Sequence, residues 1–149
     1  MKQSVSAHEE LIMRGFRLHE GFRYKAALQL FQKAFELTPT CPAAIYNLTN
    51  TMHMLDRDQE ARDLLMKLIK MSDNNLNSRC AELRQPGSYR CDALYLMFHV
   101  ILSSTSRWSK AFPFAKKHLQ NRKRGLKSAW SLRTIREEIA ELREQFSPT

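Results

Sequence analysis

Apolar residues recur at helical spacing most clearly in one stretch near the start of the chain. Five of them are three or four residues apart: Ala27, Leu30, Phe31, Ala34 and Phe35. On a helix they form one apolar stripe, and Pro39 lies just beyond the end of that stripe. Because small alanines flank Phe31, a neighbouring helix can approach closely while the ring fills the space between. The pattern predicts a helix from Tyr24 to Leu37 that packs tightly on a partner helix.

A second amphipathic segment precedes this helix, from Ala7 to about Glu20, and Gly21 opens a turn between the two. Seven positions across both segments form a motif: Gly15, Leu18, Tyr24, Ala27, Phe31, Ala34 and Pro39. This motif resembles the tetratricopeptide repeat, a helix–turn–helix unit with a period of about 34 residues. The resemblance implies a stack of antiparallel helix pairs.

The motif returns in worn form one repeat period later. Ala61, Leu65 and Leu68 stand in the places of Ala27, Phe31 and Ala34, while Thr49 replaces Gly15, Leu48 joins the upstream row and Asp73 replaces Pro39. We expect helices from Cys41 to Met54 and from Asp58 to Met71. Pro42 is tolerated in a first turn, and Asp58 is a candidate N-cap.

The periodicity fails after Met71, where turn-forming residues are dense. The sequence predicts an inserted loop over residues 72–90, with one short turn from Arg79 to Arg84. A third unit then begins with an apolar stripe of Leu94, Tyr95, Phe98 and Leu102, and Trp108 and Ala111 repeat the spacing of Tyr24 and Ala27. Its second helix is predicted from Ser109 to Asn121, because Pro113 fits only near a helix start.

Gly125 is a predicted helix stop, and a last helix is predicted from Ser128 to Phe146. Its apolar residues are spaced three, four, three and four: Leu132, Ile135, Ile139, Leu142 and Phe146. A stack of repeats leaves the apolar face of its final unit bare, so this helix is interpreted as a cap. Dimerisation through the same stripe is the alternative.

Composition agrees with one all-α domain. The chain has 149 residues, of which 43% are hydrophobic and 26% charged, with four glycines and few β-branched runs. The predicted fold is an all-α, tetratricopeptide-like superhelix of three units, about 8–41, 42–75 and 92–125, with the loop at 72–90 and the capping helix at 128–146.

The resemblance also implies a function, because the upstream helices of this family line a concave groove that holds a peptide or helix of a partner protein. Repeat equivalence assigns these residues to the groove: Glu9, Ile12, Met13, Phe16, His19, Glu20, Ala43, Tyr46, Asn47, Asn50, His53, Met54, Ala93, Leu96, Met97, Val100 and Ser103. This apolar, methionine-containing set suits the apolar face of an amphipathic helix. The alternative is that the row is core, covered by the inserted loop or the last helix.

One subgroup of the family captures a C-terminal carboxylate of a chaperone with lysines, an arginine and asparagines. Asn47 matches that clamp, but Ile12, Phe16, Ala93 and Met97 occupy its other positions. A carboxylate held against those apolar side chains would lack charge-assisted hydrogen bonds. Such a clamp is therefore not expected here.

The net charge of +9 is concentrated in the second half of the chain. Residues 76–149 contain fourteen Lys and Arg against six Asp and Glu, and no acidic residue occurs between Asp92 and Glu137. The basic residues of this stretch are Arg107, Lys110, Lys116, Lys117, Arg122, Lys123, Arg124, Lys127, Arg133 and Arg136. We expect them to favour an acidic protein partner; the alternative is nucleic acid bound through this 107–136 stretch, with Trp108 and Trp130 as stacking candidates. Trp108, however, has the spacing of a core residue.

Other function classes lack their motifs. The sequence has no Gly-rich phosphate loop, nucleophile elbow or H-E-x-x-H motif, so we expect neither an enzyme nor a cofactor site. His19 and His53 are one repeat period apart with Glu20 nearby, too few ligands for a metal site. We expect no membrane segment, and a cytoplasmic protein, because charges interrupt every long apolar run and the three cysteines, Cys41, Cys80 and Cys91, form no C-x-x-C pair. Free thiols are favoured over a Cys80–Cys91 bridge.

Overall fold

The computed structural model describes residues 6–76 and 86–147, and within those ranges it consists of helices joined by short connections, with no strand. The helices are α1 (Ala7–Glu20), α2 (Tyr24–Leu37), α3 (Pro42–Met54), α4 (Asp58–Ile69), α5 (Asp73–Leu76), α6 (Pro86–Thr105), α7 (Trp108–Lys123) and α8 (Leu132–Phe146). The predicted all-α repeat fold is confirmed.

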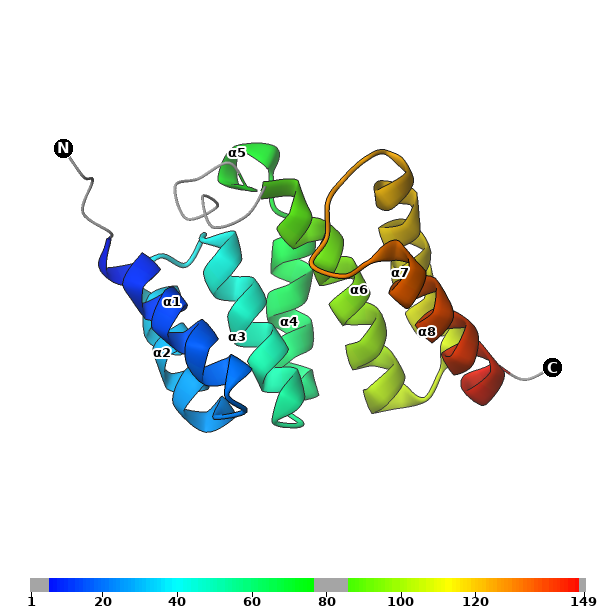
Figure 1. Ribbon diagram of the computed structural model, residues 1–149, viewed down its shortest axis with the longest axis horizontal. Coiled ribbons are helices and arrows are strands. Elements are labelled where there is room, and N and C mark those ends of the chain that lie inside the picture. Colours follow the sequence, from blue (N-terminus) through cyan, green and yellow to red (C-terminus); the bar gives the residue numbers. More distant parts are fainter. Residues whose placement is uncertain (1–5, 77–85, 148–149) are drawn as a thin grey trace.

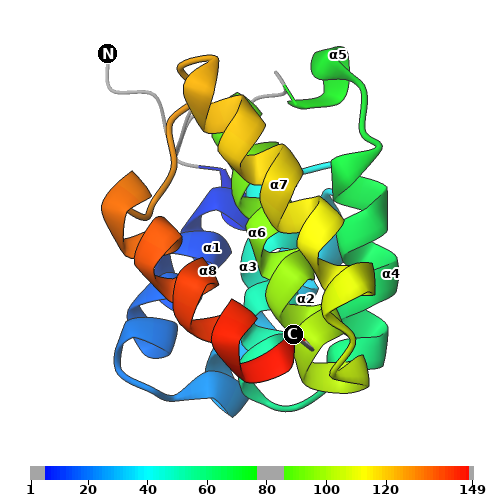
Figure 2. The same ribbon diagram turned by 90° about the vertical axis from the view of Figure 1, so that its right-hand side faces the viewer.

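Three antiparallel pairs, α1 with α2, α3 with α4 and α6 with α7, follow one another along the molecule (Figure 1). Each pair packs on the next, since α3 contacts α2 and α6 contacts α4. Turning the molecule shows that α8 lies on the side of the stack where α1 lies, whereas α7 lies on the side of α4 (Figure 2). The last helix therefore returns over the inner side of the array.

The first two units share the same turn between their helices. Phe22 and Asp56 occupy equivalent positions in the two units, and both adopt the left-handed conformation, with φ of 61° and 58°. Each donates its amide to the residue three before it, and the next residue donates to the carbonyl five before it, which is the Schellman arrangement. The third unit differs: Ser106 has φ of 55° but donates to Leu102, the simpler αL arrangement. The backbone thus repeats faithfully over two units and less so in the third.

Within the first unit, Gly15 on α1 and Phe31 on α2 approach each other closely. A Cβ atom at Gly15 would lie 2.6 Å from Cε1 of Phe31, closer than van der Waals contact allows. Phe31 is fully buried, as are Ala27 and Ala34 on the same face of α2. Because Gly15 on α1 has no side chain, the ring of Phe31 on α2 can occupy that space.

The second unit has a different pair of residues at the equivalent positions. Thr49 stands one repeat period after Gly15, and Leu65 stands one repeat period after Phe31; both are fully buried. The Thr49 hydroxyl donates to the carbonyls of Ile45 and Tyr46, both 2.9 Å away, so it is satisfied within its own helix. Compared with the first unit, the upstream helix has a larger residue at its position and the partner helix a smaller one.

The region predicted as an inserted loop contains helix at both of its ends. Residues 73–76 form α5, and α6 begins at Pro86 rather than after residue 90. The Arg90 guanidinium holds the two together through the Asp73 carboxylate at 3.0 Å. The predicted turn from Arg79 to Arg84 lies outside the described residues.

Several predicted helix ends also differ from the structure. Helix α4 ends at Ile69, and Asp58 is its first residue rather than its N-cap, with its carboxylate 2.7 Å from Nδ1 of His53. Helix α7 begins at Trp108 and places Pro113 in its second turn. The Ser109 carbonyl there lacks its usual helical donor, but the site is exposed, so water can replace the donor.

The ends of the connection between α7 and α8 have clear local causes. Gly125, with φ of 90°, follows the last turn of α7, and the amides of Gly125 and Leu126 donate to Arg122 and Asn121 in a Schellman arrangement. Helix α8 begins at Leu132, later than predicted, because the Ser131 side chain caps it by accepting from the Thr134 amide at 3.1 Å.

Phe31→Ala is predicted to lower the free energy of unfolding by about 3–5 kcal/mol, because it removes a fully buried ring from between two helices. Urea unfolding followed by circular dichroism measures this change. Phe22→Ala is the control: this ring is 79% exposed, so a change within about 0.5 kcal/mol is expected. Equal effects of the two substitutions would contradict the packing described.

Gly15→Ala is predicted to destabilise the natural chain and to stabilise a Phe31→Leu chain. With the ring present, the new methyl group overpacks the site at a cost of about 1–3 kcal/mol. With leucine, as at Leu65, the space opens and the gain of about 1 kcal/mol from replacing a helical glycine prevails. A double-mutant cycle in urea measures the sign of each step, and the same sign in both backgrounds would refute the Gly15–Phe31 contact as the cause.

Candidate functional site

A groove of about 600 Å³ opens on the inner side of the stack, between α1 and α3. Its walls come from these two helices, from the start of α6 and from the segment before α8. The lining residues are Ile12, Met13, Phe16, Arg17, His19, Glu20, Tyr46, Asn47, Asn50, Tyr89, Ala129 and Trp130. Because α1 and α3 present successive turns to the same space, residues three and four apart on each helix converge there.

The floor of the groove is apolar and its outer edge exposes large apolar side chains. Ile12, Tyr46 and Tyr89 are buried at its base. Phe16 and Met13 on α1 remain 49% and 40% exposed. Exposed apolar residues beside a concave apolar floor are typical of a surface that binds another molecule.

Polar groups within the groove divide into those already bonded and those available. Asn47 donates from Nδ2 to the Ala43 carbonyl at 2.8 Å, which leaves its side-chain oxygen as an acceptor. Among the described residues, the Asn50 carboxamide makes no hydrogen bond. This amide can both donate and accept, as the main chain of a bound peptide would require.

His19 is fixed as a neutral group at the groove wall. The Thr51 hydroxyl donates to the Asn47 carbonyl at 2.8 Å, so its oxygen accepts from Nδ1 of His19 at 3.0 Å. Burial lowers the pKa of His19, and the Glu20 carboxylate opposes that shift in part. Nε2 of His19 is then the ring's acceptor.

Trp130 closes one end of the groove and is held there by three polar contacts. Its ring lies 6.4 Å from that of Tyr46 and 5.3 Å from that of Tyr95, between centroids. The fully buried Asp92 carboxylate accepts from the Ser128 hydroxyl at 2.5 Å and from the Ala129 amide at 3.1 Å. Arg122 donates to the Trp130 carbonyl at 2.9 Å. Both α6 and α7 therefore position this segment.

Beyond Trp130, helix α8 covers the inner face of the third unit. Its Glu138 carboxylate accepts from the Tyr95 hydroxyl and lies 2.5 Å from Nε2 of His99. Burial lowers the pKa of His99, while burial and Glu138 raise the pKa of Tyr95, so both rings act as neutral donors. Ile135 and Ile139 of α8 are buried, and a smaller pocket of about 210 Å³ remains between α3, α6 and α8.

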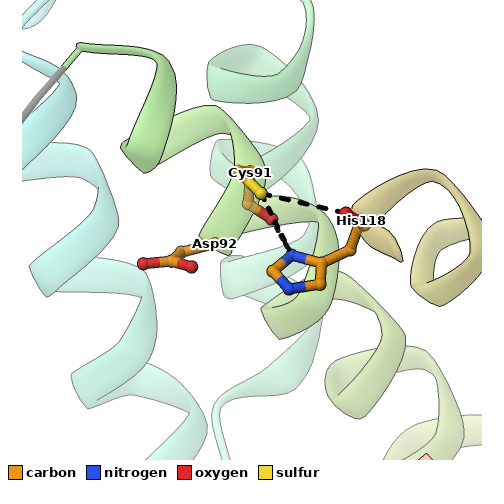
Figure 3. A group of neighbouring side chains, drawn as sticks. All are labelled: Cys91, Asp92 and His118. Carbon is orange, nitrogen blue, oxygen red and sulfur yellow. Dashed lines mark hydrogen bonds between the residues drawn. The ribbon is translucent and has the colours of Figure 1, made fainter. Parts of the chain in front are cut away.

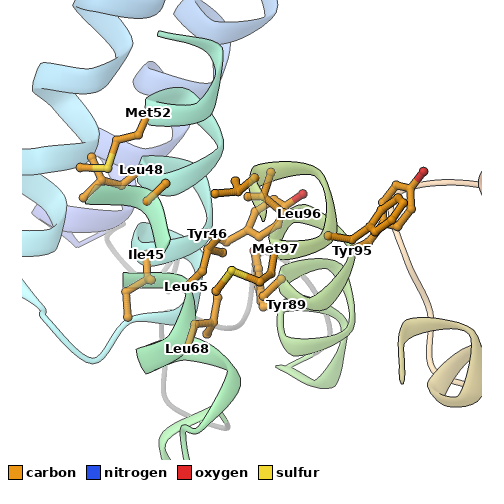
Figure 4. Packing of buried hydrophobic residues seen from close by; sticks show 14 of the residues in the cluster. Ile45, Tyr46, Leu48, Met52, Leu65, Leu68, Tyr89, Tyr95, Leu96 and Met97 are labelled. Atoms are coloured by element: carbon orange, nitrogen blue, oxygen red, sulfur yellow. The ribbon is translucent and has the colours of Figure 1, made fainter. Parts of the chain in front are cut away.

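The structure brings together eight predicted groove residues: Ile12, Met13, Phe16, His19, Glu20, Tyr46, Asn47 and Asn50. His53 and Leu96 line the smaller pocket instead, while Met54 lies at the end of α3, 47% exposed and outside both. Met97 and Val100 are fully buried, so no partner reaches them. Figure 4 shows Met97 on the side of α6 that faces α4, opposite to Tyr95.

The assignment of Met97 and Val100 to the groove is thus corrected, and the reason lies in the sequence of α6. Every residue from 91 to 102 is buried except His99, which is half-buried. A helix that is apolar all round is enclosed on every side and has no polar face to mark its orientation. The pocket-lining residues of α6 are Tyr95, Leu96 and His99, one residue earlier than repeat equivalence places them.

Residues 18–85 match the family model described as tetratricopeptide repeat. Over these residues the sequence is similar to that family, and the described helices have a tetratricopeptide-like fold. The match covers the second helix of the first unit and the whole second unit, where the turn and the packing repeat most faithfully. No curated protein and no solved structure matches the chain.

Four lining residues of this tetratricopeptide-like groove were not predicted from the sequence: Arg17, Tyr89, Ala129 and Trp130. Tyr89 falls within the expected loop, and Trp130 falls within the expected last helix. The available signal was the aromatic character of Trp130 a few residues after the predicted helix stop at Gly125. No spacing rule marks Tyr89 or Trp130, because neither belongs to a repeated position.

The third unit also contains a buried polar cluster of Cys91, Asp92 and His118 (Figure 3). Nδ1 of His118 donates to the Cys91 carbonyl at 2.6 Å and lies 3.4 Å from the Cys91 sulfur, whereas the Asp92 carboxylate bonds to Ser128 and Ala129. Nδ1 of His118 and both Asp92 oxygens are engaged in these bonds, whereas Nε2 of His118 is buried and has no hydrogen-bond partner among the described residues. The geometry of the cluster joins α6 to α7 and to the segment before α8.

The basic residues of the 107–136 stretch do not line the groove. Arg122 faces Trp130, and Arg133 pairs with Glu137 on α8 at 2.9 Å. Arg107, Lys110, Lys116, Lys117, Lys123, Arg124 and Lys127 are exposed on α7 or beside it. Arg136 is exposed on α8. Among the described residues, no helix is long and apolar enough to cross a membrane.

His118→Leu is predicted to reduce the dependence of stability on pH. Burial lowers the pKa of His118, against opposing effects from the Cys91 carbonyl and Asp92 and a supporting one from Arg122. The unfolded chain, with a histidine pKa of about 6.5, therefore binds a proton that the folded chain does not. The free energy of unfolding therefore has its full value at pH values well above about 6.5 and falls as the pH drops below that value.

Urea unfolding at intervals from about pH 7 to about pH 5 measures this effect. The natural chain should lose stability over that range, and His118→Leu, which places leucine where Leu68 stands in the second unit, should lose less. Part of the slope should remain, because burial also lowers the pKa of His19 and His99. Parallel curves for both proteins would contradict the assignment.

Proposed function

We propose that this protein is a non-catalytic interaction module that holds a helical or extended segment of another protein in the groove between α1 and α3. The family resemblance supports the class of function, and the exposed Phe16 beside an open groove of about 600 Å³ supports its place. Ile12 and Tyr46 supply the apolar floor, and Asn50 supplies a free amide. The third unit contributes Tyr89 at the start of α6, and Trp130 and α8 cover the rest of its inner face.

The chemistry of the bound segment follows from the groove itself. Apolar side chains at helical spacing would fill the space beside Phe16 and Met13, where a methionine adapts to different shapes. At the rim, Arg17 and Glu20 carry opposite charges. The groove therefore selects for apolar anchors, and the basic second half of the chain does not impose an acidic partner on it.

Phe16→Glu is predicted to weaken binding of a groove-selected peptide by at least about tenfold, equivalent to about 1.4 kcal/mol. A charge placed beside the apolar floor would have to be desolvated by the ligand. Peptides are first selected from a displayed random library on the natural protein, and the affinity of a synthetic winner is then measured by calorimetry. Leu37→Glu is the matched control, because Leu37 is 60% exposed at the end of α2, outside the groove.

Circular dichroism of both variants shows whether the fold is retained. Sedimentation equilibrium at several concentrations shows whether a second copy of the chain occupies the groove instead. Equal loss of affinity in Phe16→Glu and Leu37→Glu would refute the groove as the binding site. Failure to select any peptide that distinguishes the natural protein from Phe16→Glu would refute it as well.

A further inference from the structure

The outer face of α7 carries two parallel rows of positive charge. Lys110, Lys117 and Arg124 form one row, and Lys116 and Lys123 form the other; members of a row are seven residues apart. Seven residues span two helical turns, so neighbouring charges in a row lie about 10.5 Å apart along the axis. All five residues are exposed. We refer to these five residues as the basic stripe.

Nothing in the described chain neutralises the basic stripe. Among residues 6–76 and 86–147, none of its five members takes part in an ion pair. The helix dipole favours Lys123 and Arg124 at the carboxyl end of α7, but it disfavours Lys110 in the first turn. The stripe is therefore not explained by the stability of the helix that carries it.

The stripe also lacks the exposed apolar residues that anchor a protein–protein interface. The large apolar residues that are exposed in the described chain are Met13, Phe16, Phe22, Leu37 and Met54, all in the first two units. Protein partners bind chiefly through a few desolvated aromatic or apolar anchors, and charge alone contributes little. Phosphate groups, in contrast, are held by Lys and Arg without any apolar contact.

Single-stranded nucleic acid is a poorer fit than a duplex. Proteins that bind single strands stack bases on exposed aromatic rings. Here Trp108 stacks on Phe112 with ring centroids 5.1 Å apart, and Trp130 lies between Tyr46 and Tyr95 on the inner side. Neither ring lies on the stripe. Two straight rows of flexible cations suit the regular phosphates of a double helix.

From these observations we infer that the basic stripe of α7 binds the phosphate backbone of a nucleic-acid duplex without reading its sequence. The groove opens between α1 and α3, whereas α7 lies on the other side of the stack (Figure 2). The two surfaces can therefore be occupied at the same time. This inference does not depend on the function proposed for the groove.

Fluorescence anisotropy with a labelled DNA duplex of about 20 base pairs, across a salt series, tests the inference. Five phosphate contacts predict a slope of about −4.5 in log affinity against log salt, so affinity should fall about 500-fold between about 50 and about 200 mM. Lys110→Gln, Lys117→Gln and Arg124→Gln combined should make the slope shallower by about 2.7. The matched control, Lys25→Gln, Lys33→Gln and Lys67→Gln, removes equal charge from exposed positions of α2 and α4 and should leave the slope unchanged.

Three further probes separate the alternatives under the same conditions. A duplex of changed sequence and an RNA duplex of equal length should bind within a few-fold of the first DNA. A single strand should bind more weakly, and a poly-glutamate peptide should not compete at equal charge. The inference is overturned by no duplex binding at low salt, by equal losses in both triple variants, by a preference for the single strand, or by tighter binding of poly-glutamate.

Discussion

The stack depends on one steric relation, in which a small residue on one helix of a pair faces a large residue on the other. In the first unit Gly15 admits the ring of Phe31, with no space left for a methyl group. In the second unit the equivalent positions are Thr49 and Leu65, and both are fully buried. In the third, Tyr95 and Phe98 on α6 are large, and Ala111 and Ala115 on α7 are small; all four are buried. Each arrangement keeps the interior densely filled, which close helix packing requires.

In the third unit the large residues lie on the upstream helix, and this accounts for the position of α8. Large residues on α6 would remain exposed on the inner side, and the returning chain covers them with Trp130, Ile135 and Ile139. The cover is positioned by polar contacts that the apolar stripe of α8 does not provide. Asp92 holds the connection, Glu138 bridges Tyr95 and His99, and Arg122 holds the Trp130 carbonyl. The inner surface is thereby divided into an open part over the first two units and a covered part over the third.

The sequence predicted the elements that repeat along the chain but not the features that occur only once. The spacing of Ala27, Phe31 and Ala34 and its return at Ala61, Leu65 and Leu68 predicted two helix pairs, because periodic burial leaves a periodic pattern. Groove residues on α1 and α3 were predicted for the same reason. The orientation of α6 was not, since a helix that is apolar throughout contains no directional signal. Tyr89, Trp130 and the contacts of Asp92 depend on chain segments that meet only after folding.

The separation of the groove from the outer face of α7 bears on whether binding at one surface affects binding at the other. Coupling between the groove and the outer face of α7 would require an element with two alternative arrangements that each ligand favours differently. The connecting element is α6, which is buried along residues 91–98, tied to α7 through His118 and tied to the Trp130 segment through Asp92. These contacts join α6 to both neighbouring segments, so a second arrangement of α6 would have to break them together. The two surfaces are accordingly expected to act as independent binding faces on one rigid support.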